Sequence, residues 1–580
     1  MPQEDNLEAR QHSAAHVLMQ ALRRIYSDAI PAVGPAISEG FYYDFDSEHQ
    51  VTEADLKKIE KEMKKVVSTW TSIDGKEVTV EEAKKHFAGN PYKTEIIEEI
   101  EKKEDKITFY TSGDYTDLCA GGHSENPSKI PQDSFKLDKI AGAYWRGDEK
   151  NKMLTRIYGL AFESKKELDE YLVQREEAEK RDHRKIGKEM DLFTISPLVG
   201  PGLPLFTPKG TAMRDAITDK IGRIQAKLGY QRVSIPHITK PDLYKTSGHW
   251  EKFGDELFKV HGRDTEFVMK PMNCPHHTQI FASAPRSYKD LPIRYAENTM
   301  VYRDEQTGEL IGLARVRSIT QDDGHVFCRP DQIKQEVKNI IEVIRQFYTA
   351  LDMYNEGTYH VLLSMRDPNN KDKYIGGDDI WEKAEGILRE IAGEENLPYT
   401  EDPGGAAFYG PKLDFNFKDA LGRDRQLATV QVDFNMPSRF GLEYTEKDGT
   451  KNTPVMIHRA IAGSLERFMA IIIEHFAGDF PVWLAPVQAK VIPVSEDQNE
   501  YAKDLFGKLF DAGVRVEIDN SDNNLGKKVR NAKVERVPYI LIVGKKEQEE
   551  ESVTVEQKDG TKVGVMKIDE AVQFLREKSI

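Results

Sequence analysis

The segment over residues 296–327 (AENTMVYRDEQTGELIGLARVRSITQDDGHVF) constrains the fold more than any other part of this 580-residue chain. Two runs rich in β-branched and aromatic residues flank a polar loop with glycine, which predicts an antiparallel hairpin. Alternate residues of a strand share one face, so a strand over 315–325 would group mainly polar side chains: Arg315, Arg317, Ile319, Gln321, Asp323 and His325. Such a row fits a polar site, and a solvated sheet face with ion pairs is the alternative that the segment alone leaves open.

The arginines of this segment suit a substrate with phosphates and a carboxylate, since a guanidinium group binds both in a bidentate manner. The chain around them has 39% hydrophobic and 31% charged residues, typical of a globular protein. Its length predicts three or four domains. The formal net charge of −16 argues only weakly against a nucleic-acid partner, because RNA responds to local basic patches.

No segment of the sequence predicts secretion or a membrane span. The apolar run at 468–473 is far shorter than the roughly 20 residues that cross a bilayer. The N-terminal sequence MPQEDNLEAR lacks the basic and apolar regions of a signal peptide. Three cysteines without a CxxC pair indicate free thiols in a reducing compartment. We therefore expect a cytoplasmic protein without a membrane partner.

Periodicity and composition divide the chain into four parts. The first is predicted to contain a helix over 7–26, a Lys/Glu-rich helix over 52–69, and strands at 39–46 and 107–118. Residues 165–190 have mixed charges at helical spacing, which predicts a solvated connecting helix. After residue 488, strands and helices alternate, which predicts a small α/β domain with a largely parallel sheet. The predicted α+β multidomain chain comprises residues 1–164, the linker helix 165–190, a core over 191–481 and a C-terminal domain over 482–580.

A second segment, HRAIAGSLERFMAIIIEHF, places Gly463 and Ser464 at the start of a helix and Arg467 in its first turn. Together with the hairpin and the helix–strand segment at 209–236, it resembles the three signature motifs of class II aminoacyl-tRNA synthetases. The resemblance implies an antiparallel sheet that binds ATP with Mg²⁺, and a homodimer formed through the 209–236 region. It assigns the catalytic arginines to Arg303, Arg315 and Arg467.

Three further residues place the resemblance in the threonyl-tRNA synthetase family. Cys274 in KPMNCPHH, His325 in TQDDGHVF and His458 in PVMIHRA match that family's zinc-binding cysteine and histidines. The implied site holds one Zn²⁺ per subunit and leaves coordination positions open for the amino and hydroxyl groups of threonine. Taken singly, each residue is more simply a buried thiol or a core histidine. The family assigns further substrate contacts to Asp323, Gln321, Tyr409, Lys412, Gln426, Gln431 and Ser464.

Two nearby residues are interpreted differently. Cys328 lies on the opposite strand parity from His325 and is predicted to be a small buried apolar residue. His276 stands where the family usually has glycine, and we expect its ring to point away from the metal.

The implied activity is ligation of threonine to tRNA(Thr), through threonyl-adenylate. Serine also carries a hydroxyl and an amine, so such a site predicts a second, hydrolytic site that removes serine from mischarged seryl-tRNA(Thr). His12 and His16 lie four residues apart on one helix, and Cys119 and His123 lie in TDLCAGGH. These four resemble the editing domain shared by threonyl- and alanyl-tRNA synthetases, which also assigns Asp117, Tyr43 and Lys93 to the site.

Two alternatives remain open for this second group, namely ordinary surface histidines or a structural metal site. One departure stands out: the family usually has Arg-Gly-Pro between the cysteine and the histidine, where this chain has Ala120-Gly121-Gly122. The missing positive charge is expected to weaken the hold on the tRNA terminus.

The C-terminal domain resembles the family's anticodon-binding domain, with Glu547 on its base-reading glutamate and Arg530 on a contacting arginine. A basic stripe of Lys527, Lys528, Arg530 and Lys533 suits phosphates. Asp522 and Glu556 stand where the family has asparagine and arginine. A synthetase-derived RNA-binding regulator is the rival function, and a class II enzyme for proline or serine is a third. The retained arginines and metal ligands argue against the regulator, and the metal ligands against the proline or serine enzyme.

Overall fold

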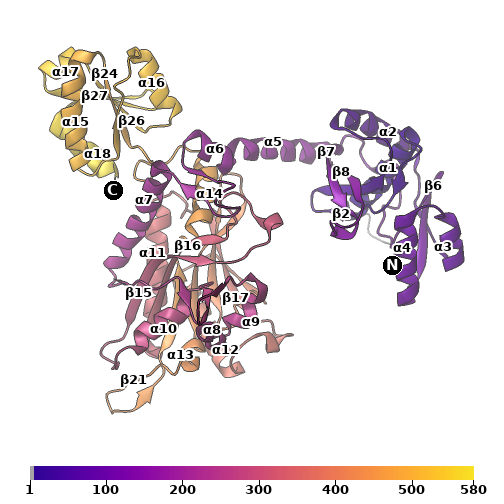
Figure 1. Ribbon diagram of the computed structural model, residues 1–580, viewed down its shortest axis with the longest axis horizontal. Coiled ribbons are helices and arrows are strands. Elements are labelled where there is room, and N and C mark those ends of the chain that lie inside the picture. The colour runs from indigo at the N-terminus through magenta and orange to yellow at the C-terminus, as the bar shows by residue number, and fades with distance from the viewer. Residues whose placement is uncertain (1–5, 580) are drawn as a thin grey trace. The chain divides into compact units, whose positions relative to one another are not determined.

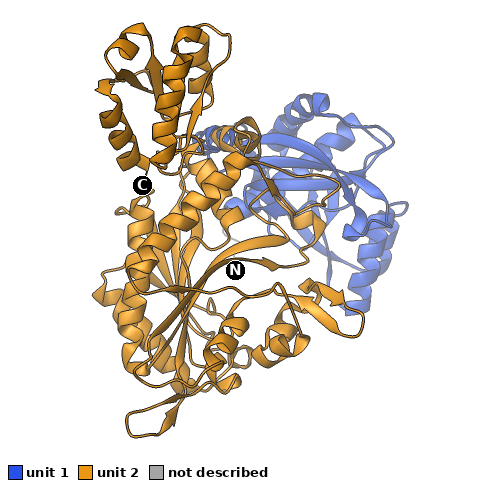
Figure 2. Ribbon diagram, turned by 60° about the vertical axis from the view of Figure 1, so that its left-hand side comes forward, with its two compact units in different colours: residues 1–176 blue, residues 177–580 orange. Residues whose placement is uncertain are grey.

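The computed structural model describes residues 6–579. The chain divides into two compact units, residues 1–176 and 177–580, coloured separately in Figure 2. The boundary lies inside helix α5 (Lys165–Arg181).

The first unit is built on helix α1 (Leu7–Ile25), which packs against an antiparallel sheet. The side chain of Asn6 caps the helix by accepting a hydrogen bond from the Ala9 amide (2.9 Å). Strand β3 (Gly40–Asp46) lies beneath α1, and the core between them contains Leu18, Leu22 and Phe41. The sheet has the order β1-β3-β8-β7, with β2 paired to β3, and α2 (Leu56–Thr69) lies beside α1. The other bounds are β1 (Ile30–Pro31), β2 (Ala36–Ile37), β7 (Phe135–Tyr144) and β8 (Met153–Ala161).

A smaller layer of the same unit carries the TDLCAGGH segment. Strands β4 (Asp74–Val78), β5 (Ile107–Ser112) and β6 (Tyr115–Leu118) form an antiparallel sheet covered by α3 (Val80–His86) and α4 (Pro91–Lys103). The segment 107–118, predicted as strand with turns, is a hairpin of β5 and β6 with its turn at residues 113–114. Strand β6 ends directly before Cys119.

The connecting helix predicted over 165–190 is two helices. Helix α5 ends at Arg181 and α6 (His183–Glu189) follows. Between them Asp182 has an extended ψ of 120°, and its carboxylate accepts a hydrogen bond from the Arg184 amide (2.7 Å). The aspartate thus begins a new helix, which a charge pattern alone did not reveal.

The second unit contains an eight-stranded sheet in the order β11-β15-β16-β23-β20-β19-β17-β18. Figure 1 labels three of these strands, β15, β16 and β17. The six central strands are antiparallel, and the outermost strands β11 and β18 pair in parallel with their neighbours. The bounds are β11 (Gln231–Arg232), β15 (Ile293–Tyr302), β16 (Ser318–Cys328), β17 (Tyr359–Met365), β18 (Tyr399–Pro403), β19 (Lys412–Lys418), β20 (Asp424–Asp433) and β23 (Val455–Ala460).

The predicted hairpin is confirmed as β15 and β16, but its second strand begins later than expected. Strand β16 begins at Ser318, so Arg315 and Arg317 lie in the preceding loop and not on the strand face. Of the residues predicted to share this strand face, only Ile319, Gln321, Asp323 and His325 lie on the strand.

One face of this sheet carries the main hydrophobic core and the other carries polar side chains. Helices α7 (Pro208–Ala226), α11 (Ile333–Thr349) and α14 (Leu465–Phe476) cover the core face, with Ile217, Ile344, Val430 and Phe468 fully buried. Helix α10 (Cys274–Ala282) lies over the polar face, where Phe281 packs on Phe327. The remaining elements of this part are β9 (Phe193–Thr194), β10 (Leu205–Phe206), β12 (Ile238–Thr239), α8 (Pro241–Ser247), α9 (His249–Phe253), β13 (Lys259–His261), β14 (Glu266–Met269), α12 (Asp378–Glu394), α13 (Met436–Arg439), β21 (Tyr444–Thr445) and β22 (Lys451–Asn452).

The C-terminal part has a mixed sheet in the order β25-β24-β26-β27-β28. The first three strands are parallel and the last two antiparallel, so the expectation of a largely parallel sheet holds for only part of it. The bounds are β24 (Ala489–Pro493), α15 (Asn499–Asp511), β25 (Val516–Ile518), α16 (Leu525–Val534), β26 (Tyr539–Val543), α17 (Lys545–Glu549), β27 (Ser552–Gln557), β28 (Lys562–Lys567) and α18 (Ile568–Ser579).

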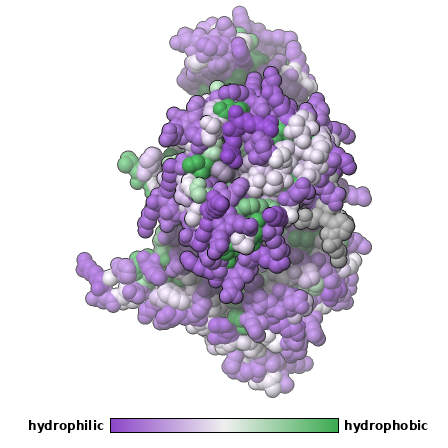
Figure 3. All heavy atoms as spheres, turned by 90° about the vertical axis from the view of Figure 1, so that its right-hand side faces the viewer, coloured by the Kyte–Doolittle hydropathy of each residue, from purple (hydrophilic) through white to green (hydrophobic). Residues whose placement is uncertain are grey.

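Over residues 6–579, no helix is both long and apolar enough to span a bilayer. The face drawn in Figure 3 is covered mainly by hydrophilic residues, with hydrophobic residues in small separate areas.

Candidate functional site

A row of functional side chains, here called the polar row, crosses the polar face of the large sheet. In the strand register Lys412 lies opposite Gln431, Gln431 opposite His458, and His458 opposite His325. Directly opposed residues of antiparallel strands point to the same face, so this register brings together residues up to 133 positions apart. The spacing of these residues in the sequence does not indicate that they lie close together.

At one end of the row lies a candidate metal centre. The donor atoms of Cys274, His325 and His458 lie within 4.8 Å of one another, and all three residues are buried. His325 Nε2 and His458 Nδ1 face each other at 3.1 Å. Their outer nitrogens have other partners: His458 Nε2 lies 2.9 Å from Asp433 Oδ2, and His325 Nδ1 lies 2.7 Å from His277 Nδ1. With the outer nitrogens occupied in this way, the inner nitrogens are the ones available to a metal.

The chemistry of this donor set fits Zn²⁺. Burial lowers the pKa of His325 well below its usual value, which keeps the ring neutral as a metal ligand must be. Burial also raises the pKa of the Cys274 thiol well above its usual value. A divalent cation reverses that preference by deprotonating a coordinating thiol. Three nitrogen and sulfur ligands match the number and the kind of protein ligands in catalytic zinc sites.

Two predicted substrate residues border the metal centre. Asp323 is buried, accepts a hydrogen bond from Asn273 Nδ2 (3.0 Å), and burial raises the pKa of its carboxyl group. The ring of Tyr409 lies 5.1 Å from that of His458. Gln431 donates to the Gly410 carbonyl (3.1 Å), which links it to the loop that carries Tyr409.

A second carboxylate, Asp414, organises the next part of the row. It forms an ion pair with Lys412 and accepts hydrogen bonds from Gln426 Nε2 (2.7 Å), Thr429 Oγ1 (2.7 Å) and Ser364 Oγ (3.0 Å). Two of the predicted contacts, Lys412 and Gln426, therefore share one buried anchor that the sequence did not reveal.

Arg303 lies in the loop directly after β15. Its guanidinium group lies over the Phe253 ring at 4.9 Å, and Nη2 contacts Met272 Sδ (3.4 Å). Within the described chain its Nε has no hydrogen-bond partner. Burial lowers the pKa of this arginine. A partly buried arginine with unused donors is suited to an anionic ligand.

The start of helix α14 is attached to β16. Ser464 caps the helix by accepting from the Arg467 amide (3.2 Å), and Ser464 forms a β-bridge with Gln321. The exposed Arg467 is thereby held beside the polar row. Arg315, by contrast, lies in the loop and donates to Glu305 (2.8 Å) and Glu309 (3.0 Å). The prediction that Arg315 lies on the strand face was wrong, because the strand begins three residues later.

Three residues that the sequence interpretation did not use lie at the metal centre. His277 and Asp433 hold the outer histidine nitrogens, and His249 Nε2 lies 3.8 Å from Cys274 Sγ. The i, i+3 spacing of Cys274 and His277 on a helix was a usable signal for one of them. His249 and Asp433 belong to distant segments, and only the fold brings them close.

The two nearby residues singled out in the sequence also have defined places. Cys328 is fully buried in the core on the other face, as predicted. His276 is not among the metal-donor atoms, and its ring lies 6.1 Å from that of Tyr244.

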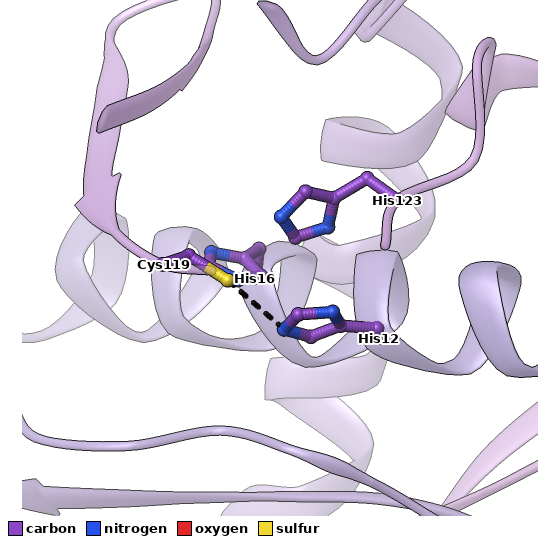
Figure 4. Close-up of side chains that lie close together, drawn as sticks. All are labelled: His12, His16, Cys119 and His123. Carbon is purple, nitrogen blue, oxygen red and sulfur yellow. Dashed lines mark hydrogen bonds between the residues drawn. The ribbon is translucent and has the colours of Figure 1, made fainter. Parts of the chain in front are cut away.

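In the first unit, His12, His16, Cys119 and His123 form a second compact group, with donor atoms within 4.8 Å of one another. Figure 4 shows the two histidines of α1 directed toward Cys119 and His123 from the TDLCAGGH segment. Cys119 Sγ lies 3.3 Å from His12 Nε2, and the rings of His12 and His123 stack at 4.3 Å. The arrangement excludes ordinary surface histidines, since His16 and His123 are buried.

A buried carboxylate supports this group from below. Asp117 forms an ion pair with Lys93 (2.5 Å), lies 3.3 Å from His16 Nδ1, and accepts a hydrogen bond from Tyr43 (2.5 Å). Burial opposes the charge of Asp117, but Lys93 and His16 outweigh it and lower its pKa. Burial also lowers the pKa of His16 to about 3. The group therefore has neutral imidazoles beside a carboxylate, which suits activation of water or coordination of a metal.

The Ala-Gly-Gly departure lies at the entrance of this group. Gly121 and Gly122 have φ of +99° and +86°, a region that favours glycine. A Cβ atom on Gly121 would lie 2.5 Å from the Tyr110 hydroxyl, so the segment is fitted to its neighbours. A cavity of about 790 Å³ opens beside it, lined by His12, His16, Lys93 and Cys119 among others.

In the C-terminal part, the residues predicted to contact RNA differ in exposure and in their hydrogen bonds. Arg530 is exposed on α16. Both oxygens of Glu547 accept hydrogen bonds, from the Gly544 amide (3.0 Å) and Thr554 Oγ1 (2.8 Å). Lys528 is buried and donates to the Pro493 carbonyl (3.2 Å), so its inclusion in the basic stripe was wrong. The stripe consists of Lys527, Arg530 and Lys533.

Comparisons with known families and proteins agree with this description. Residues 258–476 match the tRNA synthetase class II core domain (G, H, P, S and T), 488–578 match an anticodon binding domain, and 107–158 match the threonyl and alanyl tRNA synthetase second additional domain. The threonine–tRNA ligase of Deinococcus radiodurans is 50% identical over 557 residues, covering 95% of this chain and 85% of the relative. That of Gloeobacter violaceus is 47% identical, covering 99% of this chain and 92% of the relative.

Solved structures show the same relationship. The RNA binding domain of threonyl-tRNA synthetase from Cryptosporidium parvum is 35% identical, with a TM-score of 0.65 over 68% of this chain and 98% of that one. A Giardia lamblia prolyl-tRNA synthetase in complex with prolyl-adenylate has a TM-score of 0.51 over 70% of this chain and 82% of that one. At 19% identity it supports the fold alone. The chain therefore belongs to the threonyl-tRNA synthetase family of class II aminoacyl-tRNA synthetases.

Proposed function

We propose that this chain activates L-threonine with ATP, transfers it to the 3′ end of tRNA(Thr), and hydrolyses mischarged seryl-tRNA(Thr) in its first unit. The observation that carries the proposal is the group of Cys274, His325 and His458 at the end of the sheet row that also contains Gln431 and Lys412. The test is threonine-dependent exchange of pyrophosphate into ATP.

The amino acid would bind at the metal centre. When bound, Zn²⁺ would supply coordination positions for the amino and hydroxyl groups of threonine. Asp323 lies 3.7 Å from His325 and is placed to accept a hydrogen bond from the substrate hydroxyl. Valine lacks that hydroxyl and can neither complete the coordination nor donate to Asp323, which is a strong basis for rejection. Replacing His325 with alanine should abolish threonine activation.

The activation step needs charge stabilisation around ATP. A carboxylate oxygen of threonine attacks the α-phosphorus, the bond to the β-phosphate oxygen breaks, and pyrophosphate leaves. Arg303 and Arg467 have the positive charge and the available donors to hold the phosphates, together with the Mg²⁺ that accompanies ATP. A ribose hydroxyl of the tRNA terminus then attacks the carbonyl carbon and AMP leaves.

The first unit would remove serine. Serine fits the metal centre because it also has the amine and the hydroxyl, so discrimination needs a second step. His12 and Cys119 line the 790 Å³ cavity, and Asp117 with Lys93 orients the group from beneath. We propose that this cavity receives the seryl-adenosine end of the tRNA and that the group directs water at the ester carbonyl.

Two architectural proposals accompany the function. Residues 1–164, 165–190, 191–481 and 482–580 are assigned as editing domain, linker helix, catalytic core and anticodon-binding domain. The region 209–236, which includes α7 and β11, is assigned as the surface through which two chains form a homodimer. Sedimentation velocity tests the second proposal, and a monomer at micromolar concentration would contradict it.

A further inference from the structure

A buried ion pair lies on the core face of the sheet, directly behind the polar row. Arg459 Nη1 donates to Asp322 Oδ1 (2.6 Å), and both side chains are nearly inaccessible, at 1% and 2% exposure. Asp322 directly precedes Asp323 in the sequence and Arg459 directly follows His458, and both of these neighbours lie on the polar face. Alternation along the strands turns the ion pair to the opposite face.

The strand beside the ion pair is shaped to receive it. Arg459 lies opposite Gly324 in the register of β23 and β16. A Cβ atom on Gly324 would lie 2.5 Å from Arg459 Nε, so only glycine leaves room for the guanidinium group to cross the strand. This fit directs the arginine along the strand to Asp322.

The carboxylate of Asp322 also holds the turn between β23 and α14. Its Oδ2 accepts hydrogen bonds from the amides of Ile461 (2.8 Å) and Ala462 (3.1 Å). The Asp322 amide donates to the Gly463 carbonyl (2.9 Å), and Gly463 has a φ of +63°. Ser464 follows as the cap of the helix that begins with Arg467 in its first turn.

We propose that Asp322 and Arg459 are positioning residues that set the place of Arg467 relative to the polar row. Arg459 fixes the carboxylate, the carboxylate fixes residues 461–463, and these residues fix the start of α14. Neither residue contacts substrate. The inference rests on the proposed function, in which Arg467 holds the phosphates of ATP.

The alternative is that the ion pair only stabilises the fold. The surroundings of Arg459 allow an experiment to distinguish this role from the positioning role. A cavity of about 360 Å³ on the core face is lined by Asp322, Arg459, Tyr230 and Gln225 among others. Arg459 Nε and Nη2 have no hydrogen-bond partner among residues 6–579. Truncation of Arg459 would enlarge this cavity next to Asp322, so that added guanidinium ion can take the place of the lost side chain.

The test is steady-state ATP–pyrophosphate exchange by the full-length Arg459→Ala variant. We expect the KM for ATP to rise about 10- to 100-fold, as for a catalytic group displaced by roughly 1 Å. The KM for threonine and the zinc content should stay at the wild-type values, because β16 keeps its pairing with β15. Millimolar guanidinium chloride, far below denaturing concentrations, should restore the KM for ATP, whereas urea at equal concentration should not.

A second variant covers the case in which Arg459→Ala does not fold. Asp322→Asn is isosteric and should show the same selective rise in the KM for ATP, but guanidinium should not restore it. An unchanged KM for ATP in the folded variants would overturn the inference. Equal loss for ATP and threonine, with no guanidinium response, would show a structural ion pair. A wild-type chain without threonine-dependent exchange would overturn the proposed function itself, and the inference with it.

Discussion

His325 and His458 lie opposite each other on adjacent strands, with His325 Nε2 and His458 Nδ1 3.1 Å apart. Each ring has its outer nitrogen occupied, one by His277 and the other by Asp433. Such outer contacts determine which nitrogen of each ring is available to a metal. The pair of strands therefore presents two imidazole nitrogens to Cys274 in an orientation that is already set.

This relationship predicts that Asp433 contributes to metal affinity without being a ligand. Replacement of Asp433 with asparagine should weaken Zn²⁺ binding about 10- to 100-fold, since a charged outer partner both orients the ring and raises its basicity. Competition with a chromogenic chelator measures the change. Asp419→Asn is the matched control, because Asp419 is a similarly buried carboxylate that pairs with Arg423 (2.7 Å). Equal zinc affinity in the two variants would contradict the prediction.

The group in the first unit predicts a selective loss of editing. His12→Ala or Cys119→Ala should leave threonine activation intact while seryl-tRNA(Thr) accumulates, because the amino acid is activated in the other unit. Misacylation with radiolabelled serine measures this. His86→Ala is the control, since His86 is an exposed histidine of the same unit outside the group. If the wild-type chain itself fails to hydrolyse seryl-tRNA(Thr), the Ala-Gly-Gly segment has disabled the site.

Lys270 predicts a pH-dependent stability. Its ammonium group is buried and donates to Thr299 Oγ1 (2.8 Å), and burial lowers its pKa to about 8. A folded-state pKa below the unfolded value destabilises the fold while the group is charged in both states, and this cost disappears as the pH rises through about 8 toward 10.5. Lys270→Met should therefore raise the melting temperature near neutral pH by at least about 2 °C.

The advantage of Lys270→Met should shrink as the pH approaches about 10, where wild-type Lys270 is neutral in the folded state. Calorimetric scans at both pH values measure the difference. Lys289→Met, at an exposed lysine, should have no such pH dependence. A variant that melts lower than wild type near neutral pH would contradict the prediction.

The acidic departure on β27 predicts weakened RNA binding. Val553 and Val555 belong to the core under α15, so alternation places Glu556 on the opposite face, the one that α16 covers. Glu556→Arg should tighten tRNA binding, most visibly at low salt, because a new cation adds a phosphate contact. Glu500→Arg makes the same charge change on α15 and is the control. Unchanged affinity of Glu556→Arg across the salt range would show that this position does not face the RNA.

The sequence was sufficient for the elements that carry strong local patterns. The helix over 7–26 and the hairpin of β15 and β16 follow from hydrophobic periodicity and strand propensity, and the structure contains both. The ends of helices and strands were harder to predict from the sequence. The early end of α5 depends on the capping side chain of Asp182, and the late start of β16 leaves Arg315 to pair with Glu305 and Glu309 in a loop.

The residues of the candidate sites likewise include some that the sequence identified and some that it did not. Cys274, His325 and His458 were identified by resemblance, because no local pattern links residues brought together by strand register. Asp414, His277 and Asp433 were missed, since a carboxylate or imidazole that supports another side chain has no signature of its own in one sequence. Lys528 was misjudged because burial of its side chain depends on how α16 packs against β24.

The proposed function is best tested by ATP–pyrophosphate exchange with the zinc-loaded chain. The assay is run in parallel with threonine, serine and valine. We expect strong exchange with threonine, weaker but measurable exchange with serine, and none above background with valine, because valine lacks the hydroxyl that would bind the metal and donate to Asp323. Absence of exchange with threonine, or equal exchange with valine, would contradict the proposed function.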